Sequence, residues 1–215
     1  MSDAALQHAL EAALARNPDQ PAWLQALRSE ALQRFDAAGG LPTTREDDWK
    51  YTDLGDYAER LLAYAANETA RHEPAAAETQ IDICSAARID FRNGVADTLP
   101  ASPDGVRLRR FADLTGDEQT AVATELLDER PHAGITDLAT AFVTDGLLIE
   151  IEAGTRVPAP LLLSFDTDGP NAGAQPVLML RLAAQSEAEI ILHYRSDGAA
   201  SVHTVLLADC GAGSR

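Results

Sequence analysis

The chain has 215 residues, of which 34 are acidic and 17 are basic, so its formal charge is −17 at neutral pH. This excess argues against a nucleic-acid-binding protein, because a polyanion would be repelled and no basic stripe neutralises it. No apolar run approaches the ~20 residues that span a bilayer, and the acidic N-terminus lacks the basic charge of a signal peptide. Cys84 and Cys210 form no CxxC pair, so we expect a cytoplasmic protein with free thiols.

The first third of the chain is predicted to be helical. A leucine recurs every four residues before the break at Asn17-Pro18, which predicts an amphipathic helix; these leucines are Leu6, Leu10 and Leu14. A second helix is predicted from about Pro21, which suits a first helical turn, to the stop signal Gly39-Gly40. Each helix has one apolar side, so each needs a surface to pack against.

A weaker helical stretch at about 57–66 leads into residues 71–80, which are polar and Ala-rich and are predicted to be a linker. Beyond the linker the apolar residues alternate, as they do in a half-buried strand. The segment ARIDFRNGV ends in Asn93-Gly94, which predicts a β-hairpin. Residues 105–111 predict another strand, and residues 116–129 predict a helix, the last one that the pattern indicates.

From residue 146 onward, short apolar runs alternate with turn residues. Their spacing is typical of a sandwich, a barrel or a solenoid of β-rungs, and spacing alone does not choose among the three. The predicted strands are LLIEI (147–151), LLLSF (161–165), VLMLRL (177–182), EIILHYR (189–195) and SVHTVLL (201–207).

Several motifs of catalysis and ligand binding are absent. The sequence has no GxxxxGK[ST] and no GxGxxG, so we expect it neither to bind nor to hydrolyse ATP. It has no GxSxG nucleophile elbow. Residues 166–171 resemble a calcium loop, but Val177 stands where the closing glutamate should be, so a turn between strands is the better interpretation.

The five histidines show no metal-ligand spacing. His193 and His203 lie on neighbouring predicted strands and Cys210 follows, so two or three of these side chains could converge on one face. This arrangement keeps open a second hypothesis, a small-molecule enzyme on a β-helix or cupin-like barrel that uses His193, His203 and an acid. Cys84, in the apolar run IDIC, is predicted to be a buried small side chain. A plain protein-interaction module is a third hypothesis.

The segment LPTTREDDWKYTDL (41–54) is the densest patch of unusual residues. One interpretation is a recognition patch for a partner or ligand. The other, which we favour, is a packing staple in which Trp49 and Tyr51 are buried and anchor the helical region.

Two segments of the chain resemble known proteins. GLPTTREDDWKYTDL (40–54) is similar to a signature of the SufB/SufD family of iron–sulfur cluster assembly proteins, and is closest to the SufD branch. DLATAFVTDGLLIEIEAGTRVPAPLLLSF (137–165) is similar to the family's entry into its β region. The resemblance covers nearly the whole chain, but only the N-terminal part of the family's pattern. Gln175 stands where relatives commonly have a histidine.

The resemblance implies a scaffold subunit of the Suf complex that is not an enzyme. The expected partners are a SufB-type paralogue and the SufC-type ATPase, which agrees with the missing phosphate loop, and the iron–sulfur cluster is handled by the complex. No catalytic, cofactor-binding or metal-binding residue of the family maps onto this chain, and we expect no cofactor bound by the chain itself.

The fold class predicted from the residues and the resemblance together is α+β, with an N-terminal helical and mixed domain followed by the opening rungs of a right-handed parallel β-helix. The expected segments are a helical region (1–70), a linker (71–80), a small mixed α/β segment (81–145) and β-helix rungs, incomplete at the C-terminus (146–215). Because only a Gly-rich tail follows strand 201–207, we expect its uncovered edge to promote self-association. No nucleic-acid or membrane partner is expected.

Overall fold

The computed structural model describes residues 8–9, 11–12, 20–57, 60, 83–128, 133–168, 172–197 and 200–215. The chain forms two compact units that interleave along the sequence. The first unit contains Met1–Glu68 and Leu114–Val143, and the second contains Thr69–Asp113 and Thr144–Arg215. The predicted first helix, the stretch at 57–66 and the linker lie largely or wholly outside the described residues. Of the predicted first helix, residues 8–9 and 11–12 are described, and they are helical.

The first unit is helical. Helix α2 (Ala22–Ala37) begins directly after Pro21 and buries an apolar stripe that includes Leu24, Leu27 and Phe35. It ends in a Schellman motif, in which the Gly40 N–H donates to the Phe35 carbonyl at 3.0 Å and the Gly39 N–H donates to the Asp36 carbonyl at 3.0 Å. The predicted bounds of this helix are therefore confirmed.

Helix α4 (Asp117–Leu126) confirms the helix predicted at 116–129, but it is not the last helix. Helix α5 (Ala133–Ala141) follows it. The Arg28 side chain of α2 is buried and donates from Nε to the Ala141 carbonyl at 3.0 Å, which links α2 to the end of α5. The sequence pattern misses α5 because consecutive residues of its last turn are all buried, so no polar side reveals the helical period. These residues are Leu138, Ala139, Thr140 and Ala141.

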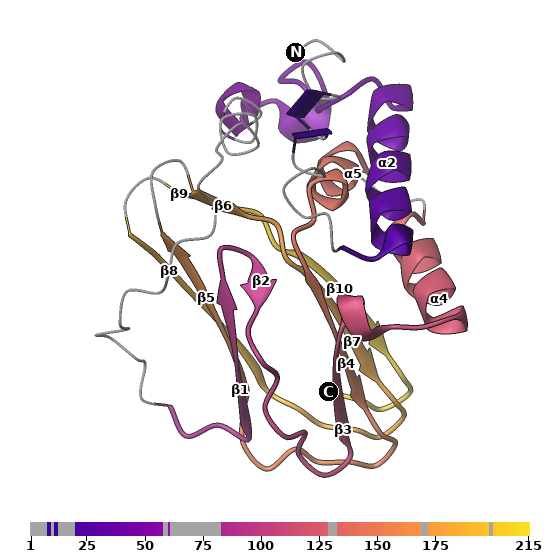
Figure 1. Cartoon of the computed structure of the whole chain (residues 1–215), viewed down its shortest axis with the longest axis vertical. Helices are drawn as coiled ribbons and strands as arrows, with labels where there is room; N and C mark the ends of the chain where they lie inside the picture. Colours follow the sequence, from indigo (N-terminus) through magenta and orange to yellow (C-terminus); the bar gives the residue numbers. More distant parts are fainter. Residues whose placement is uncertain are drawn as a thin grey trace. The chain divides into compact units, whose positions relative to one another are not determined.

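The second unit consists of three β-sheets (Figure 1). The first sheet has the order β2-β1-β5-β8, the second has the order β10-β7-β4-β3, and β6 pairs with β9. No sheet closes into a barrel among the described strands. The strand bounds are β1 Ala87–Arg92, β2 Val95–Ala96, β3 Val106–Arg110, β4 Gly146–Ile151, β5 Leu161–Asp168, β6 Ala172–Ala174, β7 Val177–Leu182, β8 Ile190–Asp197, β9 Ala200–Val202 and β10 Val205–Cys210.

The chain visits the three sheets in a repeated order. It runs through β4, β5 and β6, repeats that order in β7, β8 and β9, and then enters β10. Each later strand lies parallel to its counterpart in the previous pass, as in β4 with β7, β5 with β8 and β6 with β9. Strand β1 pairs parallel with β5, whereas β3 pairs antiparallel with β4. The fold is therefore mixed α+β with parallel and mixed sheets.

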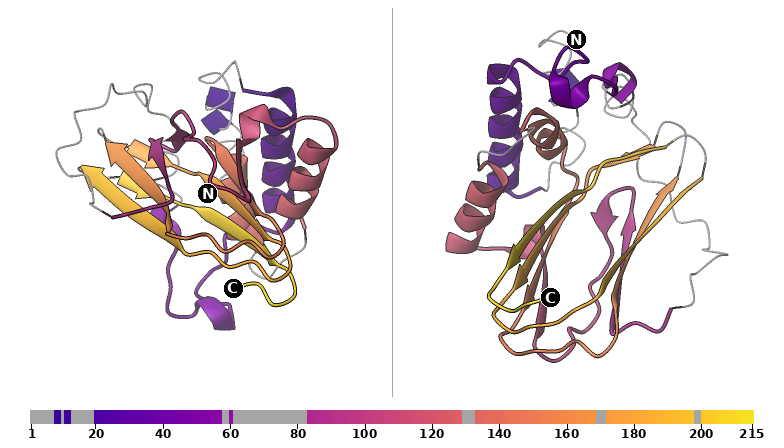
Figure 2. Two further views of the ribbon diagram at one scale, coloured as in Figure 1. Left: turned by 90° about the horizontal axis from the view of Figure 1, so that it is seen from below. Right: turned by 180° about the vertical axis from the view of Figure 1, so that it is seen from behind.

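The apolar core of the second unit lies between the two larger sheets (Figures 1 and 2). Residues at equivalent positions of successive passes stack on one another. Phe91 stacks on Phe165 with ring centroids 4.6 Å apart, and Phe165 stacks on Tyr194 at 4.8 Å. Such aligned side chains fix the register, because a slip of one residue would turn every core side chain to the opposite face.

The turns between the larger sheets also stack. The Gly154 N–H donates to the Ala184 carbonyl at 3.0 Å, and the Gln185 N–H donates to the Ala212 carbonyl at 3.0 Å. One carboxylate lies between arginines of two turns, because Glu187 Oε2 is 3.5 Å from Arg156 Nε and 3.0 Å from Arg215 Nη2. Residues 211–215, which the sequence shows only as a Gly-rich tail, form the third turn of this stack.

Two strand predictions need correction, and the predicted hairpin is confirmed. The predicted strand 201–207 is divided into β9 and β10 by a break at His203-Thr204, so β10 is the last described strand. Strand β6 was missed because three residues are too few to show alternation. The hairpin is confirmed, with β1 and β2 antiparallel and positive φ at Asn93 (47°) and Gly94 (80°), as a type I′ turn requires.

Candidate functional site

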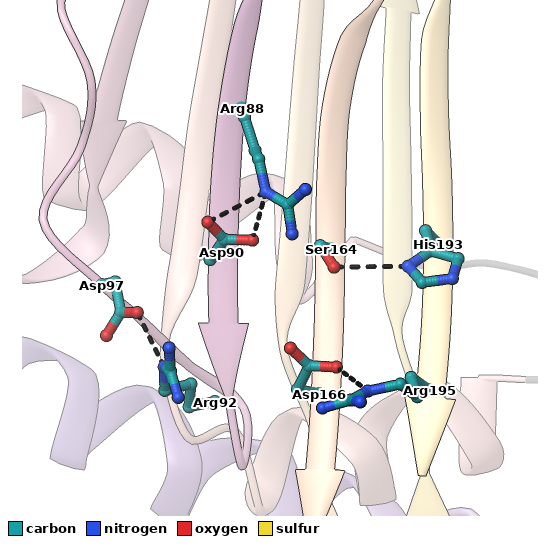
Figure 3. A network of polar contacts seen from close by, with 8 residues as sticks. All are labelled: Arg88, Asp90, Arg92, Asp97, Ser164, Asp166, His193 and Arg195. Atoms are coloured by element: carbon teal, nitrogen blue, oxygen red, sulfur yellow. Dashed lines mark hydrogen bonds and ion pairs between the residues drawn. The ribbon is translucent and has the colours of Figure 1, made fainter. Parts of the chain in front are cut away.

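A row of polar side chains crosses the outward face of the first sheet (Figure 3). Asp90 on β1, Ser164 on β5 and His193 on β8 occupy one register position. Ser164 Oγ lies 3.3 Å from His193 Nδ1, and the serine is buried. A hydroxyl beside an imidazole is the pair from which a serine nucleophile is built, so this row is the first candidate for chemistry.

Asp90, the carboxylate of this row, is not placed as the third member of a catalytic triad. A triad needs a carboxylate beyond the histidine, where it orients the ring and stabilises its positive charge. Asp90 instead lies on the far side of Ser164, and both of its carboxylate oxygens accept from Arg88 Nε, at 2.8 and 3.1 Å. The row is therefore an arrangement of paired polar groups, and the described contacts give the serine no activated base.

The neighbouring row consists of ion pairs. Arg195 Nε donates to Asp166 Oδ1 at 2.7 Å, and Arg92 Nε donates to Asp97 Oδ2 at 3.0 Å (Figure 3). Asp168, the next acid of the calcium-like stretch, accepts from Asn93 Nδ2 at 3.1 Å. Both acids of residues 166–171 therefore already have protein partners, while residues 169–171 lie outside the described residues.

The structure places His193, His203 and Cys210, which could have converged on one face, at different parts of the second unit. His193 lies on the first sheet, Cys210 ends β10 of the second sheet, and His203 lies in the break between β9 and β10. Burial lowers the pKa of His203, which disfavours its charged form. Among the described residues, no group of three His, Cys, Asp or Glu side chains is placed to hold a metal ion. Cys84, predicted to be buried in a strand, is exposed and precedes β1.

The signature segment forms a short 3₁₀ turn, η1 (Asp47–Trp49). Glu46 Oε1 accepts from the Thr43 N–H at 2.8 Å, so the glutamate fixes the entry into this turn. Trp49 is half-buried, whereas Tyr51 is 92% exposed with Lys50 Nζ 5.6 Å from its ring centroid. The prediction that Trp49 and Tyr51 form a buried pair is therefore wrong for Tyr51, because the residues after η1 turn outward.

Asp145 and Gly146, at the start of β4, lie within residues 137–165, the second segment that resembles the family. The Asp145 carboxylate is buried and accepts from the Ala96 N–H at 3.1 Å and from the Gly146 N–H at 2.8 Å. Burial raises the pKa of this carboxyl, although both backbone donors act in the opposite direction. A Cβ at position 146 would collide with the Phe111 ring. This pair therefore holds the β1–β2 hairpin and η2 (Phe111–Asp113) against β4.

Sequence reasoning did not single out Ser164 or Asp145, and it noted Gln175 only as a difference from relatives. The signal for Ser164 was its separation of 29 residues from His193, which places both at one position of successive passes. Gln175 is fully buried, and its two amide atoms have no hydrogen-bond partner in the part of the chain that the structure describes. Only the folded structure reveals that feature.

Comparison with known proteins identifies the family. A family model described as the SufBD protein N-terminal region matches residues 10–163, which include η1, the Asp145-Gly146 pair and all of β4. The chain belongs to the SufB/SufD family of iron–sulfur cluster assembly proteins. A search of curated proteins gave no match. In this SufB/SufD family member, no described helix is long and apolar enough to cross a membrane.

Proposed function

We propose that this chain is a SufD-type scaffold subunit of a Suf complex and performs no catalytic step by itself. The observation that carries the proposal is the family match over residues 10–163. The similarity of residues 40–54 to the SufD branch supports the assignment to SufD. The pairing of Asp90 with Arg88 supports a non-catalytic role, because it leaves Ser164 and His193 without an orienting acid.

The proposed partners are a SufB-type paralogue and a SufC-type ATPase. Family members act in Suf complexes, and the missing phosphate-binding loop supports a division of labour in which a partner hydrolyses ATP. The iron–sulfur cluster is then the cargo of the complex, and this chain holds no cofactor of its own. The proposed location is the cytoplasm.

We also propose that residues 146–215 are the opening coils of a right-handed parallel β-helix. The repeated order of strands, their parallel pairing and the stacked turns support this assignment. In such a solenoid each coil is covered by the next, so we further propose that the face formed by β8, β9 and β10 self-associates in this chain.

Co-expression tests the assembly role. The full chain carrying an affinity tag is produced with a SufB-type and a SufC-type protein, and the purified particle is analysed for its subunits. We expect all three proteins in one particle, and we expect iron–sulfur clusters to form on it under reconstitution. A chain that is recovered alone, with both other proteins in the unbound fraction, would contradict the proposal.

Metal analysis separates this proposal from the enzyme hypothesis. The separate placement of His193 and His203 does not favour an enzyme that uses both. We expect protein purified in air to contain no stoichiometric metal. One zinc, iron or manganese ion per chain would instead support a metal-dependent enzyme.

A further inference from the structure

A groove with a volume of about 530 Å³ lies between α2 and α4, both within the first compact unit. Its α2 wall contains Trp23, Ala26 and Leu27, and its other wall contains Thr120 and Ala123 of α4 and Leu127, which directly follows α4. Residues spaced three and four apart lie on one side of a helix, so each wall is a continuous helical face. Ala26, Thr120 and Ala123 are small, so the walls leave room for an incoming side chain above Leu27, which is itself buried.

Three of the polar side chains that line the groove already have partners. Gln119 Nε2 donates to the Leu114 carbonyl at 2.6 Å, and Thr124 Oγ1 donates to the Thr120 carbonyl at 2.8 Å. Arg34 Nε lies 3.8 Å from Asp137 Oδ1. The groove therefore offers apolar contact rather than convergent hydrogen bonds, which disfavours a small polar ligand.

The charge around the groove is negative. Glu30 and Asp128 line it and are exposed, while the lining cation Arg34 faces Asp137. Helix α4 has acids in its first turn and no basic residue in its last turn. The C-terminal end of a helix carries a negative partial charge, which adds to that of Asp128. A molecule with a net charge of −17 also attracts cationic partners from a distance.

We propose that this groove docks one basic amphipathic helix of a partner protein. The apolar stripe of the incoming helix packs against Trp23, Ala26 and Leu127, and its lysines or arginines face Glu30 and Asp128. Recognition of this kind reads apolar side chains at i, i+3 or i+4, and i+7. The inference goes beyond the assembly role and does not depend on it.

Peptide binding to the full chain tests the proposal. The probe is a fluorescent peptide of about 16 residues, long enough to form a helix, with leucines along one side and lysines on the other. A second peptide of the same composition has its leucines scattered. We expect the striped peptide to bind about tenfold more tightly than the scattered one in fluorescence anisotropy, because only the stripe matches the groove. Equal affinity would mean attraction by charge alone and would overturn the proposal.

Paired variants locate the binding site. Ala26→Trp fills the groove, and Ala37→Trp adds the same side chain at an exposed position of α2 outside it. We expect Ala26→Trp to weaken binding of the striped peptide about tenfold and Ala37→Trp to leave it unchanged.

A second pair of variants tests the charge. Glu30→Lys should weaken binding more than Asp104→Lys, which makes the same charge change on the second unit. Equal effects within both pairs would overturn the proposal. If only Ala26→Trp changed the number of chains per particle, the groove would be a contact between copies of this chain. That result would also overturn the proposal.

Discussion

Asp145 shows how one buried carboxylate joins separate segments of the β unit. Its two oxygens accept N–H groups from β2 and from β4, while its own carbonyl accepts from the Val177 N–H at 3.0 Å. The charges facing it are Arg110 and Asp113, which act in opposite directions and are weaker influences than burial. The carboxylate is therefore held in position by backbone donors, at a cost in desolvation.

Asp145 should make stability depend on pH in one direction. Because burial raises its folded-state pKa above the ordinary value of 3.8, the folded chain binds more protons than the unfolded chain between those two values. Its contribution to stability is fully present below the unfolded pKa and is lost as pH rises through the folded pKa. We therefore expect the stability advantage of the wild type over Asp145→Asn, measured by urea unfolding between pH 4 and 7, to shrink as pH rises.

An exposed aspartate is the control for the loss of a carboxyl group. Asp104→Asn removes the same charge at an exposed turn position, where burial contributes nothing. We expect that its stability difference from the wild type changes less over the same range of pH. An advantage over Asp145→Asn that grows as pH rises would show that the backbone donors outweigh burial.

Gln175 is a second buried polar residue, and its cost to stability should be measurable. A buried polar group without a hydrogen-bond partner costs about 1–3 kcal/mol. Gln175→Met keeps a similar unbranched shape and removes both amide atoms, so we expect the free energy of unfolding to rise by about 1 kcal/mol. Urea denaturation checks this value.

Gln25 provides the matched comparison. Its Nε2 donates to the Gln20 carbonyl at 2.8 Å, so Gln25→Met loses a hydrogen bond and should leave stability unchanged or lower. If Gln175→Met destabilised the chain as much as Gln25→Met or more, the buried amide would have an interaction that its described surroundings do not reveal.

The stacked aromatic column ties β1, β5 and β8 into one element. Phe91 and Phe165 are fully buried, whereas Tyr194 is 46% exposed and donates from its hydroxyl to Thr204 Oγ1 at 3.0 Å. Phe165 touches a ring on each side, and Tyr194 touches one. The middle ring therefore carries the most packing energy in the column.

Truncation of the column should show this gradient. Phe165→Ala should cost about 3–5 kcal/mol, because it opens a cavity between two rings. Tyr194→Ala should cost less, since nearly half of that side chain is already in solvent. Equal losses in urea denaturation would mean that Tyr194 is covered in solution by something outside this chain's described residues.

The sequence predicted those helices and strands whose ends are marked by capping or turn residues, or whose apolar residues repeat at a regular spacing. Pro21 and the two glycines after α2 marked that helix, and Asn93-Gly94 marked the hairpin. Helix α5 and strand β6 gave no such signal, because one is buried around its last turn and the other is three residues long. The exposure of Tyr51 could not be predicted either, since the outward direction of the chain after η1 depends on its backbone path.

The candidate site was less predictable than the fold, because it depends on register between distant strands. Ser164 and His193 meet only because β5 and β8 align residue by residue over their whole length. His203 is close to His193 in sequence, but it lies in the break between β9 and β10, whereas His193 lies on β8 of the first sheet. Membership of the SufB/SufD family followed instead from local motifs, and the family match confirms it.

The exposed apolar residues of β8, β9 and β10 favour association between copies of the molecule. Tyr194, Val202 and Leu206 are aligned with buried residues of the preceding pass, namely Phe165, Ala174 and Leu178. They are therefore core positions of the stack that lie in solvent, next to the uncovered edges of β8 and β10. Such edges tend to pair with another chain.

We expect light scattering to show particles that contain more than one copy of the 215-residue chain. The net charge of −17 opposes association, but charges separated by more than ~8 Å are screened at physiological ionic strength. The fraction of associated chains should therefore rise with salt. Leu206→Glu places a charge on the proposed face and should shift the particles toward monomers. Val95→Glu adds the same charge at an exposed position on β2, at the opposite edge of the first sheet, and should not. A monomer at tens of micromolar protein and moderate salt, or equal effects of the two substitutions, would show that this face is not where copies meet.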